Sequence, residues 1–371
     1  DDAMFYMMKF KERFEKEYSN HEAYLATFYS NLAIAYADKD DFQQALAYDQ
    51  KAYDIRKRVL GTYSKDMAIT YISLAEDYLQ FNRNDEAKEC IIKAEEICKN
   101  SNLKSKIAIR INTLKTTENE LIKVLEEKKI IYNKTEYDNF LILEKVKNIE
   151  NMQEFKEGYF TIQDISAGQT AKILNPQPGE NVLDACSAPG GKTTYMAELM
   201  KNNGKIEAWD IHEHRTKLVE KNAKRLGINI IDTKVKDATV YDENLNEKYD
   251  KILLDVPCLG IGVIKRKPDI KWQRKKEDVE EITKIQKQIL NNCSKYLKKG
   301  GNIVYSTCSI LCAENEKIIQ GFLEKNENFE IVENTEICIF PDMEKDGFFI
   351  CKMHKKWLIL QVCYKHITFI L

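Results

Sequence analysis

The sequence is poor in glycine and proline, with only 14 and 6 of them among 371 residues. This scarcity excludes collagen-like and low-complexity chains. The 43% hydrophobic and 31% charged residues are typical of a helix-rich globular protein. At 43.3 kDa the chain is long enough for two or three domains, each with its own core.

Net charge is nearly absent, since the formal value at pH 7 is -2. Any surface for nucleic acid must therefore be a local patch, because the chain as a whole carries no positive field. Long apolar runs are missing too. The most apolar stretch, residues 357–371, is interrupted by Lys365 and His366 and is shorter than the roughly 20 residues of a spanning helix. We therefore expect no membrane segment.

Histidine is scarce, and the ten cysteines follow no regular spacing. The chain opens DDAMFYMMKFK, which lacks the charged and apolar pattern of a secretory leader. Both features indicate a reducing cytoplasm, where thiols stay free. Cys308 and Cys312 lie four residues apart, but neither a second pair nor any of the five histidines completes a tetrahedral set. We expect no metal.

The first distinctive feature that the chain does contain is an internal repeat. The segment that begins at Asn31 aligns with the segment that begins at Ser73, an offset of 42 residues. Small residues at close-contact positions and apolar residues at helical spacing predict one antiparallel helical hairpin in each unit. The matched residues are Leu32 with Leu74, Ala33 with Ala75, Tyr36 with Tyr78, Ala45 with Ala87, Ala52 with Ala94, and Ile55 with Ile97.

These residues resemble a tetratricopeptide repeat of the long, kinesin-light-chain-like type. The resemblance implies a helical repeat domain over residues 1–100, and aligning Ala3 with Ala45 predicts half of a further repeat at the start. Two and a half repeats fall short of the roughly three that such a stack needs. The array is either a packing scaffold or a groove for a protein or peptide, and the sequence leaves both open.

From Ile107 onward the pattern changes. The stretch IAIRINTLK alternates like a strand, an amphipathic helix follows with Thr116 or Thr117 as its cap, and a second strand begins at Phe140. We interpret residues 101–157 as a small α/β module that precedes a larger one.

Strands and helices then alternate over residues 158–356. Such alternation predicts a Rossmann-like, doubly wound parallel sheet, whose ligands bind at the carboxyl ends of its strands. We assign no role to the tail, residues 357–371. The sequence does not decide whether this tail and the repeats belong to the native protein.

The stretch DACSAPGGK, residues 184–192, places paired glycines directly after the first strand of this sheet. Glycines there let a ligand approach the backbone closely. The spacing is neither GxGxxG nor that of a P-loop. Asp210, Asp237 and Asp255 end the next three strands. Three carboxylates at one sheet edge beside a glycine turn favour a bound nucleoside.

Residues 253–272 read as a loop, because its prolines and glycines would break a helix or strand. It carries Asp255 and Cys258, and cations follow them. A charge run alone is typical of a solvated face, but beside the predicted pocket it favours RNA phosphates. The cations are Lys265, Arg266, Lys267, Lys271, Arg274, Lys275 and Lys276.

The glycine turn, this loop and the stretch YSTCSILCAENE at 305–316 together resemble the Nol/Nop/Sun family of RNA 5-methylcytosine methyltransferases. The similarity is greatest to its bacterial Sun/Fmu branch, which modifies 16S ribosomal RNA, and covers about residues 107–356. Val256 and Leu259 depart from the alanine and serine that the family often has. The repeats stand where that branch carries a NusB-like domain, and the resemblance implies that the small module at 101–157 is associated with RNA.

The resemblance implies S-adenosylmethionine as cofactor and Cys308 as the nucleophile that adds to carbon 6 of cytosine, since carbon 5 alone reacts poorly. Asp255 would protonate ring nitrogen 3, Cys258 would help to remove the carbon 5 proton, and Lys192 would favour the Cys308 thiolate. The PC motif alone, Pro257 and Cys258, would instead make Cys258 the nucleophile. The implied cofactor residues are Cys186, Ser187, Ala188, Pro189, Gly190, Gly191, Lys192, Asp210, Asp237 and Asp255, and the implied RNA-binding residues are Lys265, Arg266 and Lys267.

Two other hypotheses stay open. In one, the repeats bind a partner protein while the second half is a non-catalytic platform for RNA and S-adenosylmethionine. In the other, two unrelated genes have been fused by error.

Overall fold

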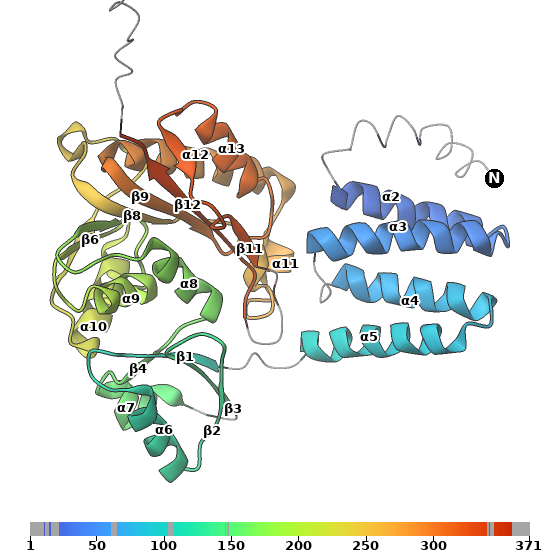
Figure 1. The fold of residues 1–371 in the computed structure, drawn as a ribbon, viewed down its shortest axis with the longest axis horizontal. Coiled ribbons are helices and arrows are strands. Elements are labelled where there is room, and N and C mark those ends of the chain that lie inside the picture. The colour runs from blue at the N-terminus through green and yellow to red at the C-terminus, as the bar shows by residue number, and fades with distance from the viewer. Residues whose placement is uncertain are drawn as a thin grey trace, which may run out of the picture. The chain divides into compact units, whose positions relative to one another are not determined.

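The computed structural model describes residues 11, 15, 22–60, 65–102, 107–144, 146, 148–339, 341 and 345–357. The chain divides into two compact units, with the boundary between residues 105 and 106. Figure 1 shows both. The additional half repeat predicted from Ala3 and the apolar stretch of the tail after residue 357 lie outside the described residues.

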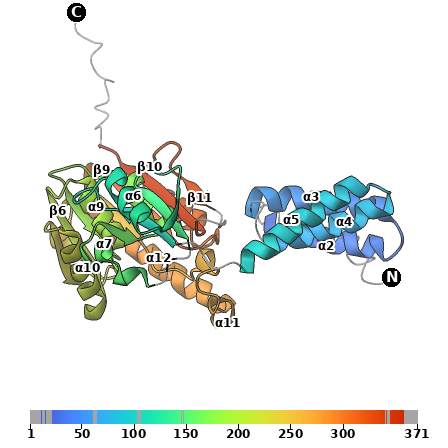
Figure 2. The same cartoon turned by 90° about the horizontal axis from the view of Figure 1, so that it is seen from below.

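The first unit consists of paired helices, drawn from blue to cyan in Figures 1 and 2. Each of the two predicted repeats forms one helical hairpin. The first hairpin is α2 (Glu22–Ala37) and α3 (Phe42–Leu60), and the second is α4 (Lys65–Gln80) and α5 (Asn84–Asn102).

The residues that matched at an offset of 42 fill the core of this unit. Leu32 and Leu74 are both buried, as are the alanine pairs at the close contacts between helices. The ring of Tyr36 stacks on that of Tyr48, with centroids 5.4 Å apart. The helical-repeat prediction is therefore confirmed.

The second unit begins with a small sheet in the order β2-β3-β1-β4. Thr117 caps its helix through a capping box with Glu120, as expected for one of the two threonines. The sheet takes a strand from beyond residue 157. Its elements are β1 (Ile107–Ile111), α6 (Glu118–Glu127), β2 (Ile131–Lys134), β3 (Phe140–Glu144) and β4 (Phe160–Ile162).

A larger sheet follows in the order β10-β12-β9-β8-β5-β6-β7, with β11 paired to β12. Its central strands are parallel, and β12 joins β9 in the antiparallel sense. The strands are β5 (Asn181–Asp184), β6 (Lys205–Asp210), β7 (Ile231–Val235), β8 (Tyr249–Asp255), β9 (Leu297–Thr307), β10 (Phe329–Ile331), β11 (Ile337–Ile339) and β12 (Phe348–Lys355).

Helices cover both faces of this sheet, which confirms the Rossmann-like architecture. One core contains Cys293 and Phe322 from two of the helices, and the other contains Ala171, Met196 and Ala223 from three more. The first face has α12 (Lys276–Tyr296) and α13 (Glu316–Leu323), and the second has α8 (Ile165–Leu174), α9 (Gly191–Leu199) and α10 (Glu213–Leu226).

The strand order fixes where a ligand can bind. From β5 the chain proceeds through β6 and β7 in one direction, and through β8 and β9 in the other. The order therefore reverses between β5 and β8, and ligands of doubly wound sheets bind outside the carboxyl ends of the strands at such a point. Asp184 and Asp255 end these two strands.

Candidate active site

The glycine turn connects β5 to α9 and is fastened to the end of β6. Ser187 donates two hydrogen bonds to the carbonyl oxygen of Trp209, from its amide at 2.8 Å and its hydroxyl at 2.9 Å. Gly190 precedes α9 with a φ of 102°, a left-handed conformation that glycine adopts at little cost. An added Cβ at Gly190 would lie 3.1 Å from Cα of Val219, so glycine there lets the turn pack closely against α10.

Asp184 is a buried carboxyl beside this turn. Thr193 donates a hydrogen bond of 2.7 Å to its Oδ2, whereas its Oδ1 has no hydrogen-bond partner. Burial raises the pKa of Asp184 to about 7. Sequence reasoning placed Asp184 in the motif without assigning it a role, although its place at the end of the first strand was a signal.

Asp210 lies next to the glycine turn, as predicted. Its Oδ1 accepts a hydrogen bond of 3.0 Å from the amide of His212, and its Oδ2 lies 3.2 Å from Nη1 of Arg215. Arg215 also donates to the carbonyl oxygen of Ala188 at 3.1 Å. The arginine thus holds the carboxylate and the turn together.

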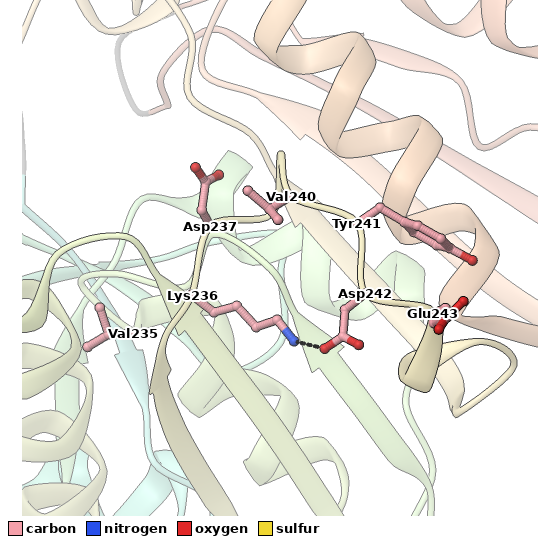
Figure 3. A pocket seen from close by; sticks show the side chains of 7 residues that line it. All are labelled: Val235, Lys236, Asp237, Val240, Tyr241, Asp242 and Glu243. Carbon is pink, nitrogen blue, oxygen red and sulfur yellow. Dashed lines mark hydrogen bonds and ion pairs between the residues drawn. The ribbon is translucent and has the colours of Figure 1, made fainter.

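Asp237 lies two residues beyond the end of β7, on the rim of a pocket (Figure 3). Thr239 donates to its Oδ1 from both its amide and its hydroxyl. The amide of Lys236 donates to the carbonyl oxygen of Asp210 at 3.1 Å, so the pocket adjoins the end of β6. It is lined by Val235, Lys236, Asp237, Val240, Tyr241, Asp242 and Glu243.

Asp255 is engaged through both of its oxygen atoms. Nζ of Lys192 lies 2.7 Å from Oδ2, and the hydroxyl of Ser306 donates to Oδ1 at 2.9 Å. Burial opposes the charge of Lys192, but the carboxylate of Asp255 outweighs it and raises the lysine pKa. Lys192 is therefore paired directly with Asp255, and its charge reaches Cys308 only as a secondary influence.

The two cysteines of the site are in contact. Sγ of Cys258 lies 2.9 Å from Sγ of Cys308, and both thiols are free. A hydrogen bond from Cys258 lowers the pKa of Cys308, against burial and the charge of Asp255, and Lys192 lowers it further. The same hydrogen bond, together with burial, raises the pKa of Cys258. Cys308 is thus the thiol of the pair that ionises more readily.

Glu314 connects the segments that carry the two cysteines. Its fully buried carboxylate accepts hydrogen bonds from the Ser309 hydroxyl at 2.6 Å, the Leu259 amide at 3.0 Å and the Gln286 side-chain amide at 3.0 Å. Gln286 also donates to the carbonyl oxygen of Pro257. Sequence reasoning missed this residue, although it lies within the stretch YSTCSILCAENE.

Gly262 makes a second connection through backbone atoms. Its amide donates to the carbonyl oxygen of Cys308 at 3.0 Å, and its own carbonyl oxygen accepts from the amide of Gly347 at 2.9 Å. A Cβ at position 262 would lie 2.1 Å from the carbonyl oxygen of Gly347. Only glycine fits there.

The three predicted RNA-binding cations differ in what they contact. Nη2 of Arg266 lies 2.6 Å from Oδ2 of Asp164, and its Nε donates to Asp346 at 3.0 Å. Its guanidinium therefore fixes the loop to α8 and to the segment before β12. Lys265 is half-buried beside Asp346, whose pKa burial and Asp164 raise to about 6. Lys267 is exposed.

Arg110 is a buried cation that sequence reasoning did not identify. Its Nη2 lies 2.6 Å from Oε1 of Glu198, and its Nη1 donates to the carbonyl oxygen of Gly191 at 2.8 Å and to Gln163. It joins β1 of the small sheet to the first turn of α9. An arginine in an alternating strand gives no signal of such a partner.

Two absences hold within the part of the chain that the structure describes. No three histidine, cysteine, aspartate or glutamate side chains gather there as a metal site would require. None of the described helices combines the length and apolar character needed to cross a membrane.

Comparison with known proteins agrees with this architecture. Residues 171–354 match the family model for the 16S rRNA methyltransferase RsmB/F, and residues 24–100 match a tetratricopeptide repeat model. The crystal structure of a methyltransferase homologue from Pyrococcus horikoshii is 31% identical, with a TM-score of 0.61 over 71% of this chain and 91% of that one. The chain belongs to the RsmB/F methyltransferase family.

Curated RsmB/F relatives are longer than this chain. The probable ribosomal RNA small subunit methyltransferase B of Bacillus subtilis is 37% identical in an alignment of 280 residues that covers 71% of this chain and 63% of that protein. The Proteus mirabilis enzyme is 37% identical over 265 residues, 71% and 62% respectively. The chain thus spans less than two thirds of either relative. NSun6 from Pyrococcus horikoshii, solved with SFG, shares the fold at 23% identity and a TM-score of 0.63, over 72% of this chain and 95% of that one.

Proposed function

We propose that this chain transfers the methyl group of S-adenosylmethionine to carbon 5 of a cytosine in 16S ribosomal RNA, through a transient bond between Cys308 and carbon 6. The observation that carries the proposal is the contact between Cys258 and Cys308, 2.9 Å apart, which lowers the pKa of Cys308. The names of the family and of the curated relatives support ribosomal RNA of the small subunit as the substrate.

The residues at the sheet edge fit S-adenosylmethionine. Asp184, which has a buried oxygen without a hydrogen-bond partner, and Asp210 end neighbouring strands beside the glycine turn, near the place where the strand order reverses. We propose that residues 186–192, Asp210 and Asp237 hold the cofactor, with Asp255 at the border between cofactor and base. When bound, the cofactor supplies an electrophilic methyl group on its sulfonium.

The two cysteines are suited to different steps. Cys308, with the lower pKa, is the better thiolate at neutral pH and attacks carbon 6. A bond forms between its Sγ and carbon 6 while the carbon 5–carbon 6 electron pair shifts to carbon 5. Cys258 has the raised pKa, so its thiolate is the stronger base. Once Cys308 is bonded to carbon 6, the hydrogen bond that holds the Cys258 proton is lost and that proton passes to solvent. The Cys258 thiolate then accepts the carbon 5 proton, the carbon 5–carbon 6 double bond re-forms, the bond from Sγ of Cys308 to carbon 6 breaks, and ring nitrogen 3 returns its proton to the Lys192–Asp255 pair.

Asp255 supports the attack from the pyrimidine's other edge. As cysteine adds, ring nitrogen 3 gains negative charge and must be protonated or hydrogen-bonded. The ion pair between Lys192 and Asp255 supplies that proton, while Ser306 fixes the second carboxylate oxygen at 2.9 Å. The target cytosine must leave its stack to reach these groups.

The helical repeats of the first unit are the part of the chain that we propose binds a protein or peptide. Its helices expose several large apolar side chains, including Ile34, Ile69, Ile72 and Leu79, which supports a protein or peptide ligand for the repeats. The nine described cysteines are all free, which supports a cytoplasmic location.

The test uses the full chain with S-adenosylmethionine labelled in its methyl group and unmodified 16S ribosomal RNA transcribed in vitro. We expect label in the RNA, and bisulfite sequencing should find it on one or a few cytosines. The variant Cys308→Ala is the inactive control. Cofactor binding measured by calorimetry without any transfer would instead support a non-catalytic platform, and label on adenine or guanine would refute the cytosine chemistry.

A further inference from the structure

Trp272 is the most exposed large apolar side chain among the described residues, at 88%. It lies in the short helix α11 (Ile270–Gln273). Ile270, two positions earlier, is buried and approaches Gly260, where an added Cβ would lie 3.1 Å from its Cδ1. Residues two apart in a helix point in nearly opposite directions. The helix is therefore anchored by Ile270 and presents the indole of Trp272 to solvent.

The segment around this indole is strongly basic. Residues 264–276, IKRKPDIKWQRKK, contain seven lysines and arginines and a single acidic residue, Asp269. Arg266 is engaged by two carboxylates, but Lys267, Arg274 and Lys275 are exposed. An isolated exposed tryptophan is unremarkable, whereas one surrounded by cations matches what single-stranded nucleic acid requires, a ring face for bases and positive charge for phosphates.

The basic segment is attached at both ends to the proposed active site. Near its start, the amide of Gly262 donates to the carbonyl oxygen of Cys308 at 3.0 Å. Near its end, Nε of Arg274 donates to the carbonyl oxygen of Leu259, the neighbour of Cys258, at 3.2 Å. The position of Trp272 is thereby coupled to that of both cysteines.

We propose that Trp272 is a stacking platform for a base of the RNA next to the target cytosine, with Lys267 and Lys275 contacting the flanking phosphates. This inference rests on the proposed function. Removing a cytosine from its stack leaves the adjacent base without a neighbour, and an indole offers a replacement that accepts any base. Trp272 thus binds the single-stranded flank of the substrate and takes no part in the chemistry.

The kinetic test compares Trp272→Ala and Trp272→Phe with Trp357→Ala, a matched control whose indole is 68% exposed. With the 16S transcript as substrate, the alanine variant should raise KM about tenfold at nearly constant kcat, as expected for the loss of one base–aromatic stack. Phenylalanine should restore part of the difference, and the control should match the wild type. An unchanged KM, or a loss confined to kcat, would overturn the inference.

A second measurement does not require methyl transfer. The chain has three tryptophans, and Trp209 is fully buried. Titration with poly(C) should quench the fluorescence of the wild type and of Trp357→Phe, but much less that of Trp272→Phe. If the wild type transfers no methyl group and this quenching is still seen, the proposed function fails while the stacking platform stands. If transfer is normal and the quenching does not depend on Trp272, the platform fails alone.

The surface around Trp272 must also be tested for binding to a second copy of the chain. Sedimentation velocity of the wild type and of Trp272→Ala should give the same oligomeric state. A wild-type dimer that Trp272→Ala converts to a monomer, with unchanged RNA affinity, would assign this surface to self-association and overturn the inference.

Discussion

Cys258 and Cys308 touch because they follow neighbouring parallel strands in register. Asp255 at the end of β8 pairs with Ser306 of β9, and the two sulfur atoms beyond these residues lie 2.9 Å apart. One contact therefore sets two different thiol environments, with the pKa lowered at Cys308 and raised at Cys258.

Replacing Cys258 and replacing Cys308 should each block a different step of the reaction. We expect Cys308→Ala to abolish methyl transfer, because no thiolate remains to attack carbon 6. Cys258→Ala should instead accumulate a covalent complex of protein and RNA, because release is blocked. Denaturing gels after incubation with 16S transcript and S-adenosylmethionine would show the complex, and its appearance with Cys308→Ala in place of Cys258→Ala would reverse the roles.

The hydrogen bond between the thiols should be visible in the titration of Cys308. Removing the donor with Cys258→Ala should raise the pKa of Cys308, so alkylation by iodoacetamide should require higher pH. Cys258→Ser, which keeps a donor, should lie closer to the wild type. Mass spectrometry of the Cys308 peptide across pH measures the rate. Identical profiles for the alanine and serine variants would contradict a role for the hydrogen bond.

Glu314 should act as a positioning residue for both cysteine segments. Glu314→Gln exchanges one acceptor for a donor against Leu259 N, Ser309 Oγ and Gln286 Nε2, which displaces the segments. A misplacement of this kind lowers kcat by about a hundredfold. The alkylation profile of Cys308 and the KM for S-adenosylmethionine should change much less.

The matched control for Glu314 is Glu324→Gln at the exposed end of α13, which should be neutral. If Glu314→Gln lowers stability in urea but leaves kcat near that of the wild type, the residue only stabilises the fold and has no part in placing the cysteines.

Replacing only one partner of the buried ion pair between Arg110 and Glu198 should lower the free energy of unfolding more than replacing both. Their side chains are 0% and 1% exposed. Arg110→Met alone leaves a buried carboxylate and should lower the free energy of unfolding by about 3–5 kcal/mol. The double variant Arg110→Met with Glu198→Leu should recover most of this. Urea unfolding followed by tryptophan fluorescence reports on the second unit, which contains all three tryptophans, and additive losses would refute this expectation.

The repeats should lose stability as pH rises. Burial and the neighbouring Asp77 carboxyl raise the pKa of Asp49 to about 7, and burial raises that of Asp77 to about 6, whereas an unfolded aspartate titrates near 4. Because the folded pKa values are raised, their stabilising contribution is full below pH about 4 and is lost as pH rises through about 7. The loss is on the order of 2–4 kcal/mol.

Asp49→Asn should remove most of this pH dependence and stabilise the repeats at pH 8. Helical circular dichroism during thermal unfolding follows the helices of both units, whereas tryptophan fluorescence follows the second unit alone, because the first has no tryptophan. The part of the helical transition that fluorescence does not show therefore belongs to the repeats. The exposed Asp54→Asn on the same helix is the control. Equal pH slopes for the wild type and Asp49→Asn would show that the pair is not protonated in the folded repeats.

The sequence was most informative where local pattern determines position. The offset of 42 placed Leu32 and Leu74 correctly in a helical core. Strand ends brought Asp210 and Asp255 to one sheet edge, because parallel strands share it. The family resemblance, rather than strand ends, placed Cys258 and Cys308 in one site, and the structure brings their sulfur atoms into contact.

Contacts between distant residues could not be predicted in this way. Arg110 meets Glu198 across 88 positions, and Arg266 meets Asp164 across 102. Periodicity indicates which face of an element is buried and says nothing of which opposite charge lies against it. The cation run therefore suggested RNA contacts for Arg266, whose guanidinium the structure shows bonded to two carboxylates.

The backbone bonds of Gly262 limit how the sequence of this protein can vary. Gly262 is hydrogen-bonded to Cys308 and Gly347 through main-chain atoms alone. The number of residues between Cys258 and Gly262 therefore matters more for these bonds than which residues they are. Inserting or deleting one residue between Cys258 and Gly262 would move the glycine out of step with both partners, and random libraries should recover no functional length variants there.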